Sequence, residues 1–240
     1  MEIPAQLALT LSRGGTINNE ASLAWSSLPG DVSAPQSTFN ADSTERLYDP
    51  LNPADIYIVN SSVSLTIPEL PQTGFAPGRI TVLPSQSEDM QYVALDSLWM
   101  EIPKLGVKMN IVGVPFNEAN WNLTWLGSQA GYLDGTAYPT HAGNTGLTGH
   151  AYLADGTPGP FAKLDQLRYG DQVIVHFGGQ RYVYEVRQNQ LVKPTDLSVL
   201  KHEKYSWLTL ITCKLYNEQA GDYLYRVSVR AVLVKVEDDR

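Results

Sequence analysis

The feature that most constrains the fold is a succession of strand-like segments, with no long helix between them, from residue 80 to the C-terminus. Apolar and polar residues alternate, or short apolar runs end at turn residues, in LWMEIPKLGVKMNIVGV, DQVIVHF, RYVYEVRQNQLV and DYLYRVSVRAVLVKV. Only residues 161–167 and 194–200 suit short helices. Because many strands without intervening long helices argue against a parallel α/β sheet, we expect an all-β fold closed into a barrel.

Residues 1–67 have a different pattern. Strand alternation surrounds Leu23 and Trp25 and returns over residues 56–67, with a loop-like Asp-, Ser-, Asn- and Pro-rich segment between. Two or three strands cannot bury a core alone. The runs TINNEASLAWSSLPGDV and SSVSLTIPE resemble the C-terminal part of a sandwich repeat of bacterial surface proteins, which implies a partial β-sandwich and a chain cut from a longer protein. A poorly ordered leader is the alternative interpretation.

A Pro- and Gly-rich stretch, residues 68–79, separates these two regions. It contains LPQTGFAPGR, with two prolines and two glycines in ten residues, which predicts an exposed and extended linker. We therefore expect a first region at 1–67, a linker at 68–79 and a barrel domain at 80–240.

Charge and cysteine content exclude several classes of function. The 240-residue chain has 17 Lys and Arg against 25 Asp and Glu, a formal net charge of -8, which does not favour nucleic acid or an anionic membrane. Its single cysteine excludes an internal disulfide and a thiolate-cluster metal site. No apolar run approaches the ~20 residues that span a bilayer, and the N-terminus lacks a basic segment followed by an apolar one. We expect export and anchoring signals to be absent from this chain.

The single cysteine, Cys213, ends the strand-like run WLTLITC, next to a loop. A lone cysteine is often only a small buried hydrophobe. To act as a nucleophile it must ionise, and because an unperturbed thiol has a pKa of roughly 8.5, it needs a cationic neighbour or a base.

Four histidines are available, and His150 is the best placed. It ends the run GNTGLTGH, and so lies at a strand terminus as Cys213 does. His141 lies nearby in a Pro and Gly loop and is the weaker candidate. Strand alternation in DQVIVHFGG favours a structural role for His176, and His202 belongs to a charged loop.

An arginine near the thiol could stabilise the negative charge that builds on a carbonyl oxygen during thiolate attack. Arg226 and Arg230 share one face of the last long strand. Four residues at ~3.3 Å each separate them by about 13 Å, so only one can approach the thiol.

Together these segments resemble the active-site segments of the sortases, the cysteine transpeptidases of bacterial cell surfaces. The family pattern Thr-Leu-x-Thr-Cys is matched by residues 209–213. His150 precedes Cys213 by 63 residues (213 minus 150), and Arg226 follows it by 13 (226 minus 213). The likeness covers residues 82–236 and implies a closed sortase-type β-barrel.

The resemblance also implies roles. Cys213 would attack the threonine carbonyl of an LPxTG-like signal and form a thioester, which an amine acceptor of the cell wall or of a protein resolves. His150, as imidazolium, would protonate the leaving amine, Arg226 would hold substrate carbonyls, and Thr212 would add a hydroxyl contact. The resemblance implies no metal or organic cofactor and a place on the extracellular face of a bacterial cell. We also expect a monomer and, from the net negative charge, no nucleic-acid partner.

One segment departs from the simplest sortases. Residues 117–144 are more elaborate and contain Trp121 and Trp125, which either shape substrate entry or plug one end of the barrel. The sortase class therefore stays open.

The linker itself contains an LPxTG-like signal, formed by Leu70, Pro71, Gln72, Thr73 and Gly74. A usual signal precedes an apolar membrane segment and a basic tail, whereas this one precedes the enzyme region. Two interpretations remain: a substrate in cis, cut between Thr73 and Gly74, or an uncleaved autoinhibitory lid across the groove. Outside the enzymes, the alternative is a non-catalytic structural module of a bacterial surface protein. A different thiol enzyme, the L,D-transpeptidase type, is disfavoured because the chain has no Ser-His-Gly-Cys run.

Overall fold

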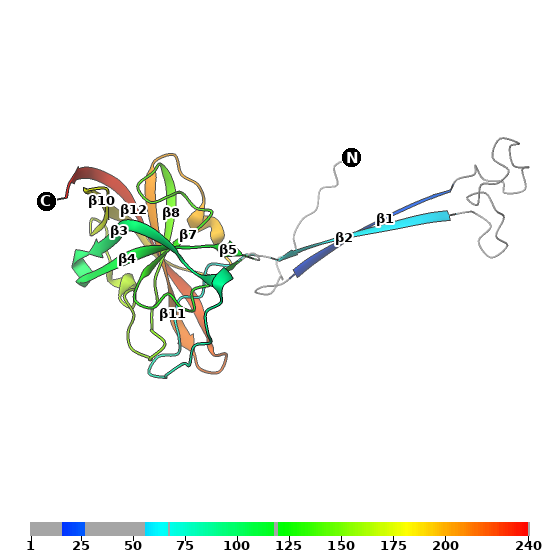
Figure 1. Ribbon diagram of the computed structural model, residues 1–240, viewed down its shortest axis with the longest axis horizontal. Coiled ribbons are helices and arrows are strands. Elements are labelled where there is room, and N and C mark those ends of the chain that lie inside the picture. The colour runs from blue at the N-terminus through cyan, green and yellow to red at the C-terminus, as the bar shows by residue number, and fades with distance from the viewer. Residues whose placement is uncertain (1–15, 27–55, 67, 118–119, 240) are drawn as a thin grey trace, which may run out of the picture. The chain divides into compact units, whose positions relative to one another are not determined.

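The computed structural model describes residues 16–26, 56–66, 68–117 and 120–239 (Figure 1). These residues fall into two compact units. One contains the two N-terminal strands, and the other runs from Pro68 to the end of the described chain. No helix in the described ranges has both the length and the apolar character needed to cross a bilayer.

The N-terminal unit is a two-stranded antiparallel sheet. Strand β1 (Thr16–Ser26) pairs with β2 (Ile56–Thr66) in a register that runs from Thr16 opposite Thr66 to Ser26 opposite Ile56. Both predicted strands are therefore confirmed. The other parts of the proposed repeat lie outside the described residues, so the partial β-sandwich stays a prediction.

The second unit is a closed barrel of eight strands, in the order β10-β12-β11-β8-β7-β4-β3-β9. This confirms the all-β closed barrel that the strand pattern predicts. Its strands are β3 (Val93–Ile102), β4 (Val107–Val114), β7 (Ala130–Leu133), β8 (Gly143–Thr148), β9 (Gln172–Phe177), β10 (Gln180–Val192), β11 (Ser206–Asn217) and β12 (Asp222–Asp238). A small separate sheet pairs β5 (Phe116–Asn117) with β6 (Asn120–Trp121).

Short 3-10 helices connect the strands. They are η2 (Glu88–Met90), η3 (Pro103–Leu105), η4 (Leu164–Gln166) and η5 (Leu197–Leu200). The last two lie inside the segments for which the sequence predicts helical pieces. The barrel core packs inward-facing side chains from several strands and from the η4 segment, including fully buried Ile102, Leu147, Phe161, Leu208 and Val229.

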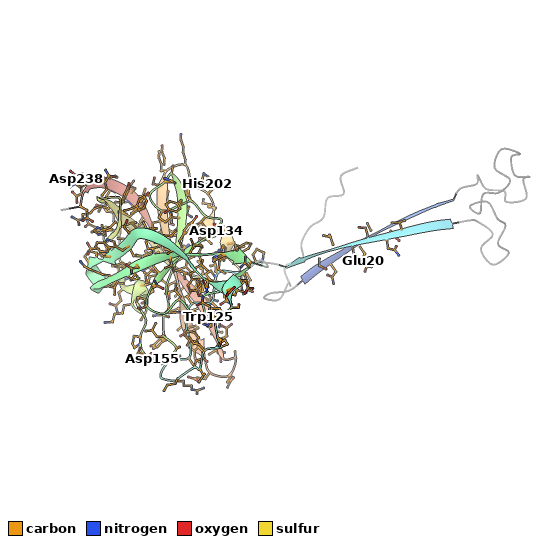
Figure 2. All side chains as sticks on the ribbon, in the orientation of Figure 1. Glu20, Trp125, Asp134, Asp155, His202 and Asp238 are labelled. Atoms are coloured by element: carbon orange, nitrogen blue, oxygen red, sulfur yellow. The ribbon has the colours of Figure 1, made fainter. Side chains whose placement is uncertain are left out.

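Strand β11 is central to the site because it has a parallel and an antiparallel neighbour. It runs parallel to β8, with Ile211 opposite Thr148, and antiparallel to β12, with Cys213 opposite Arg226. Because parallel strands end at the same side of a sheet, Cys213 and the chain that follows β8 meet at one end of the barrel. Asp155 lies toward this end and His202 toward the opposite end (Figure 2).

The two threonines of the Thr-Leu-x-Thr-Cys segment connect β11 to β8. Thr209 Oγ1 donates a hydrogen bond to Asn144 Oδ1 at 2.7 Å, and Thr212 Oγ1 donates to the Gly149 carbonyl oxygen at 2.8 Å. All of these groups are buried. The hydroxyls therefore fix the thiol-bearing strand against the segment that leads to His150.

Residues 70–81, called the strap below, pack against the barrel instead of forming an exposed linker. The Leu70 side chain is 1% exposed, in an apolar cluster with Trp121 and Ile211. The Leu70 N–H donates to the Pro194 carbonyl oxygen at 2.8 Å, and the Thr81 N–H donates to that of Ala154 at 2.7 Å. The prediction of exposure is therefore wrong for Leu70 and also for Pro71 and Thr73, which are buried too. The segment is buried by contacts with Pro194 and with the apolar cluster, and local composition does not encode these contacts.

Candidate active site

Cys213 lies under the strap and contacts Thr73 on two sides. The Thr73 N–H donates to Cys213 Sγ at 3.0 Å, and the Cys213 N–H donates to Thr73 Oγ1 at 2.8 Å. The thiol is 2% exposed. Burial raises the pKa of this thiol, while the Arg226 charge and the Thr73 hydrogen bonds oppose that rise. In this arrangement the sulfur is held mainly as a neutral thiol.

Arg226, directly across the ladder from Cys213, binds the strap backbone. Its Nε donates to the Pro71 carbonyl oxygen at 2.9 Å, and its guanidinium is buried, with Nη1 contacting the carbonyl oxygens of Tyr223 and Tyr225. Of the two arginines on this face, it is Arg226 that lies beside the thiol.

Arg230 lies farther along the strand, opposite Thr209. It forms an ion pair with Glu203 at 2.6 Å, and its guanidinium lies 4.7 Å from the centroid of the Trp207 ring. These contacts give Arg230 a structural role at a position away from the thiol.

His150 is two residues past the end of β8 and 1% exposed. Its ring contacts that of Phe75, with 5.1 Å between centroids. Burial lowers the pKa of His150 to about 4, and the backbone of Leu123 opposes this shift only in part. Among the described residues, neither ring nitrogen has a hydrogen-bond partner of good geometry. The imidazole therefore stays neutral at pH 7 while the strap covers it.

A cavity of about 300 Å³ adjoins His150. Gly74 and Phe75 of the strap line one part of it, and residues 120–124 line another. The imidazole therefore contacts the Phe75 ring of the strap and shares the cavity lining with Gly74.

A donor that sequence reasoning missed is the backbone N–H of Ala151. It donates to the Thr73 carbonyl oxygen at 2.9 Å, which is the carbonyl that precedes Gly74. Thr73 is fully buried, and its Oγ1 is also 3.5 Å from Thr212 Oγ1. A backbone donor has no residue-type signature, so no motif could have indicated it.

The other residues of the LPQTG segment also have specific neighbours. Gln72 is exposed, and its Nε2 donates to Asp222 Oδ1 at 3.0 Å. Gly74 lies against the ring of Tyr223, whose hydroxyl donates to the Phe75 carbonyl oxygen at 2.7 Å. Tyr223 is a second residue that sequence reasoning missed, because nothing in its local sequence distinguishes it from other strand tyrosines.

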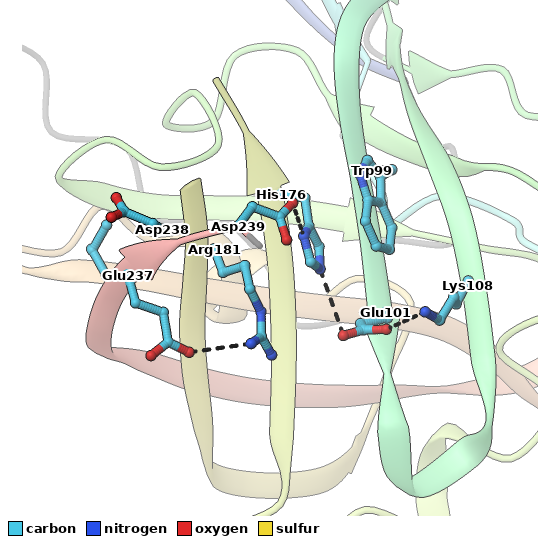
Figure 3. Close-up of a pocket in the computed structure, with 9 residues that line it drawn as sticks. Trp99, Glu101, Lys108, His176, Arg181, Glu237, Asp238 and Asp239 are labelled. Atoms are coloured by element: carbon cyan, nitrogen blue, oxygen red, sulfur yellow. Dashed lines mark hydrogen bonds and ion pairs between the residues drawn. The ribbon is translucent and has the colours of Figure 1, made fainter. Parts of the chain in front are cut away.

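The remaining histidines lie elsewhere. His141 and His202 are exposed. His176 stacks on Trp99 with 3.5 Å between ring centroids, and its Nδ1 pairs with Asp239 Oδ2 at 2.7 Å (Figure 3). Its Nε2 is 3.6 Å from a carboxylate oxygen of Glu101. These contacts attach the end of the described chain to β3 and β9, in agreement with the structural role expected for His176.

Both tryptophans of the elaborate segment are anchored by their indole N–H groups. Trp121 Nε1 donates to the Asp134 carbonyl oxygen at 3.0 Å, and Trp125 Nε1 donates to that of Pro84 at 2.8 Å. Trp121 packs in the apolar cluster that receives Leu70, and it also lines the cavity beside His150. It therefore combines a packing role with a place at the site.

Comparison with known proteins identifies the family. The chain is 34% identical over 94 residues to Sortase A of Staphylococcus aureus, a match that covers 38% of this chain and 45% of that protein. The match thus spans less than half of the relative's length. The fold is similar to Sortase A from Corynebacterium diphtheriae, a lid mutant, with 26% identity, a TM-score of 0.50, and coverage of 61% of this chain and 73% of that one.

A structure of sortase C-1 from Actinomyces oris has 29% identity and a TM-score of 0.49, with coverage of 57% of this chain and 73% of that one. The family model of the sortase domain matches residues 100–234. That range is more than half of the 240 residues. The chain therefore belongs to the sortase family, whose members are cysteine transpeptidases.

Proposed function

We propose that this chain cuts an LPxTG-like signal after its threonine, through a thioester on Cys213, and transfers the threonine carbonyl to an amine. We propose further that its own Leu70–Gly74 segment is one such donor, bound in cis. The observation that carries the proposal is the set of contacts around Thr73. Its N–H meets Cys213 Sγ at 3.0 Å, and its carbonyl oxygen accepts from Ala151 N–H at 2.9 Å.

The first half-reaction would form the thioester. The Cys213 thiol would give its proton to His150, and the resulting thiolate adds to the Thr73 carbonyl carbon while the electron pair of the C=O bond moves onto oxygen. Ala151 N–H is a preorganised donor for that oxyanion. When the C=O bond re-forms, the bond to the Gly74 nitrogen breaks, and His150 gives a proton to the departing amine.

The second half-reaction would reverse these roles. An incoming amine adds to the thioester carbonyl and loses a proton to His150, and the Cys213 thiolate leaves. Water in place of the amine gives hydrolysis. Arg226 would hold the donor through the Pro71 carbonyl, and its charge favours the thiolate. Thr212 would keep Cys213 in register through its bond to Gly149.

One observation favours the autoinhibitory lid as a second candidate role for the strap. Burial raises the pKa of Cys213 and lowers that of His150, so the closed arrangement favours the neutral pair over a thiolate and an imidazolium. A strap that opens would rehydrate both groups and allow the ion pair. The same segment therefore acts as a bound donor if it is cut and as a lid if it is only displaced.

The domain proposal follows from these roles. Residues 1–67 would be the partial β-sandwich repeat of a surface protein, residues 68–79 the segment with the LPQTG signal, and residues 80–240 the catalytic domain. The donor would be an LPxTG-bearing surface protein or this chain's own segment. The acceptor would be an amine of the cell wall or of a protein, on the extracellular face of a bacterial cell.

An external peptide tests the activity on a donor outside the chain, which must first displace the strap from Cys213. The full chain should cleave an LPQTG peptide with a fluorophore and a quencher at its ends, and added triglycine should yield the transfer product. Cys213→Ala should give neither product. Retained turnover in this variant, with the fold intact by circular dichroism, would rule out Cys213 as the nucleophile.

A further inference from the structure

We infer that Tyr223 restricts the residue after the scissile bond to glycine. The inference rests on the proposed function, because it treats the strap as bound in the manner of a substrate. It concerns a residue that no motif in the chain singles out. The side chain touches the donor segment on the leaving side of the Thr73–Gly74 bond.

The space beside Gly74 is closed by the Tyr223 ring. A Cβ atom added to Gly74 would lie 3.2 Å from Tyr223 Cε2, 3.2 Å from its hydroxyl oxygen and 3.3 Å from Cζ. These distances are shorter than ordinary van der Waals contacts. Any residue with a side chain would therefore have to displace the ring or the strap.

The ring has little freedom to move. Tyr223 is 2% exposed, its ring packs edge-on against Tyr216 at 5.0 Å between centroids, and its backbone N–H donates to Asp222 Oδ1 at 2.6 Å. It also belongs to the small cluster that contains Ala151 and Cys213. A side chain at position 74 would overpack a site whose surroundings are already fixed.

The hydroxyl of the same residue holds the leaving segment. It donates to the Phe75 carbonyl oxygen at 2.7 Å, and burial raises the pKa of Tyr223, so the group remains a donor at neutral pH. One side chain thus binds the backbone one residue beyond Gly74 and excludes a side chain at Gly74. The hydroxyl supplies affinity, whereas the ring supplies selectivity.

The same geometry sets the class of acceptor. By microscopic reversibility, the incoming amine takes the position of the Gly74 nitrogen, and its first carbon then faces the Tyr223 ring. An amine on an unsubstituted CH₂ carbon takes this position without such a contact. An amino terminus with a branched α-carbon would bring its β-carbon to about 3.2 Å from the ring, so that the ring or the acceptor must shift by a few tenths of an ångström.

A double-mutant cycle in the full chain tests the inference. The variants are Gly74→Ala, Tyr223→Ala and their combination, with Tyr223→Phe as the matched variant that keeps the ring and loses the hydroxyl. Two quantities are measured for each: the rate at which iodoacetamide alkylates Cys213, which reports strap displacement, and the amount of fragment that begins at residue 74 after incubation with triglycine. The first readout does not require any cleavage.

Gly74→Ala should raise the alkylation rate by about tenfold or more and lower fragment release to a similar extent. The Tyr223→Ala background should remove most of this effect, whereas the Tyr223→Phe background should retain it. A Gly74→Ala effect of equal size in all backgrounds would overturn the inference and assign the effect to the backbone at Gly74, where φ is 156°. No effect of Gly74→Ala would overturn it as well.

The two readouts distinguish a failure of the proposed function from a failure of the inference about Tyr223. If the unmodified chain transfers nothing to triglycine while alkylation still follows the predicted cycle, the steric contact stands and the transferase activity fails. If the unmodified chain reacts normally but the cycle shows no coupling between positions 74 and 223, only the inference fails.

Discussion

Thr73 and Cys213 exchange two hydrogen bonds across the active site: the backbone N–H of each residue donates to the side chain of the other, at 3.0 Å to Cys213 Sγ and 2.8 Å to Thr73 Oγ1. The two residues are 140 positions apart in the chain. The threonine of the LPQTG segment is therefore recognised by its hydroxyl and its backbone, and its recognition is coupled directly to the thiol.

Thr73→Val should loosen the strap. The substitution keeps the shape of the side chain but removes the acceptor of the buried Cys213 N–H, and a buried donor without a partner costs about 1–3 kcal/mol. We expect faster alkylation of Cys213, by roughly tenfold. Thr73→Ser keeps the oxygen and is the control. Equal rates for the unmodified chain and both variants would show that this hydrogen bond does not hold the strap.

Arg226→Ala should slow transfer from an external LPQTG peptide by roughly ten- to a hundredfold, the scale expected when a hydrogen bond from a charged donor, worth about 1.5–3 kcal/mol, is lost. The physical reason is the loss of the Pro71 carbonyl contact and of the charge that favours the thiolate. Arg230→Ala is the matched control, because its guanidinium pairs with Glu203 instead. Comparable losses of kcat/KM in both variants would contradict the assignment.

Leu70→Ala should displace the strap by removing its buried anchor. A buried leucine truncated to alanine typically costs about 2–5 kcal/mol, and part of that cost falls on strap docking because Leu70 is 1% exposed within the apolar cluster. Hydrogen exchange at the Ala151 amide should accelerate, since that amide donates to Thr73. Val82→Ala, at a position 90% exposed, is the control and should leave the exchange unchanged. An Ala151 amide that is equally protected in Leu70→Ala would show that this side chain does not anchor the strap.

Acid should destabilise the closed site through His150. The pKa of this histidine is lowered from 6.5 to about 4 by burial, so its contribution to stability is present above pH 6.5 and is lost as the pH falls toward 4. The melting temperature of the unmodified chain should therefore fall more over this interval than that of His150→Asn, which cannot titrate there. Parallel curves for the two proteins would mean that His150 is not held neutral by burial.

The barrel and the chemical groups were predictable from the sequence because each has a local signature. Strand alternation indicated the segments that pair in the barrel, and the Thr-Leu-x-Thr-Cys pattern indicated Cys213 on a strand. The expectation that the strand ends at Cys213 is wrong, because β11 continues to Asn217 and pairs with β12 over these residues. The 13-residue interval between Cys213 and Arg226 suited the family and favoured Arg226 over Arg230. In the structure Cys213 lies opposite Arg226 in the β11–β12 ladder.

Burial of the strap was not predictable in this way. A Leu-Pro-Gln-Thr-Gly segment has the composition of a linker, and its burial depends on contacts with Trp121, Pro194 and Cys213, all of which are remote from it in sequence. Ala151 contributes a backbone N–H with no residue-type signature. The two contacts of Tyr223 also require coordinates: a ring atom 3.2 Å from the position that a Cβ of Gly74 would occupy, and a hydroxyl that donates to the Phe75 carbonyl oxygen.

Transfer in cis is tested most directly by the intact mass of the full chain after incubation with triglycine. Two products are expected, residues 1–73 carrying triglycine on Thr73 and a fragment that begins at Gly74, and neither should form in Cys213→Ala. A chain that keeps its full mass with triglycine, under conditions in which it transfers an external LPQTG peptide, would contradict transfer in cis and leave the strap as a lid.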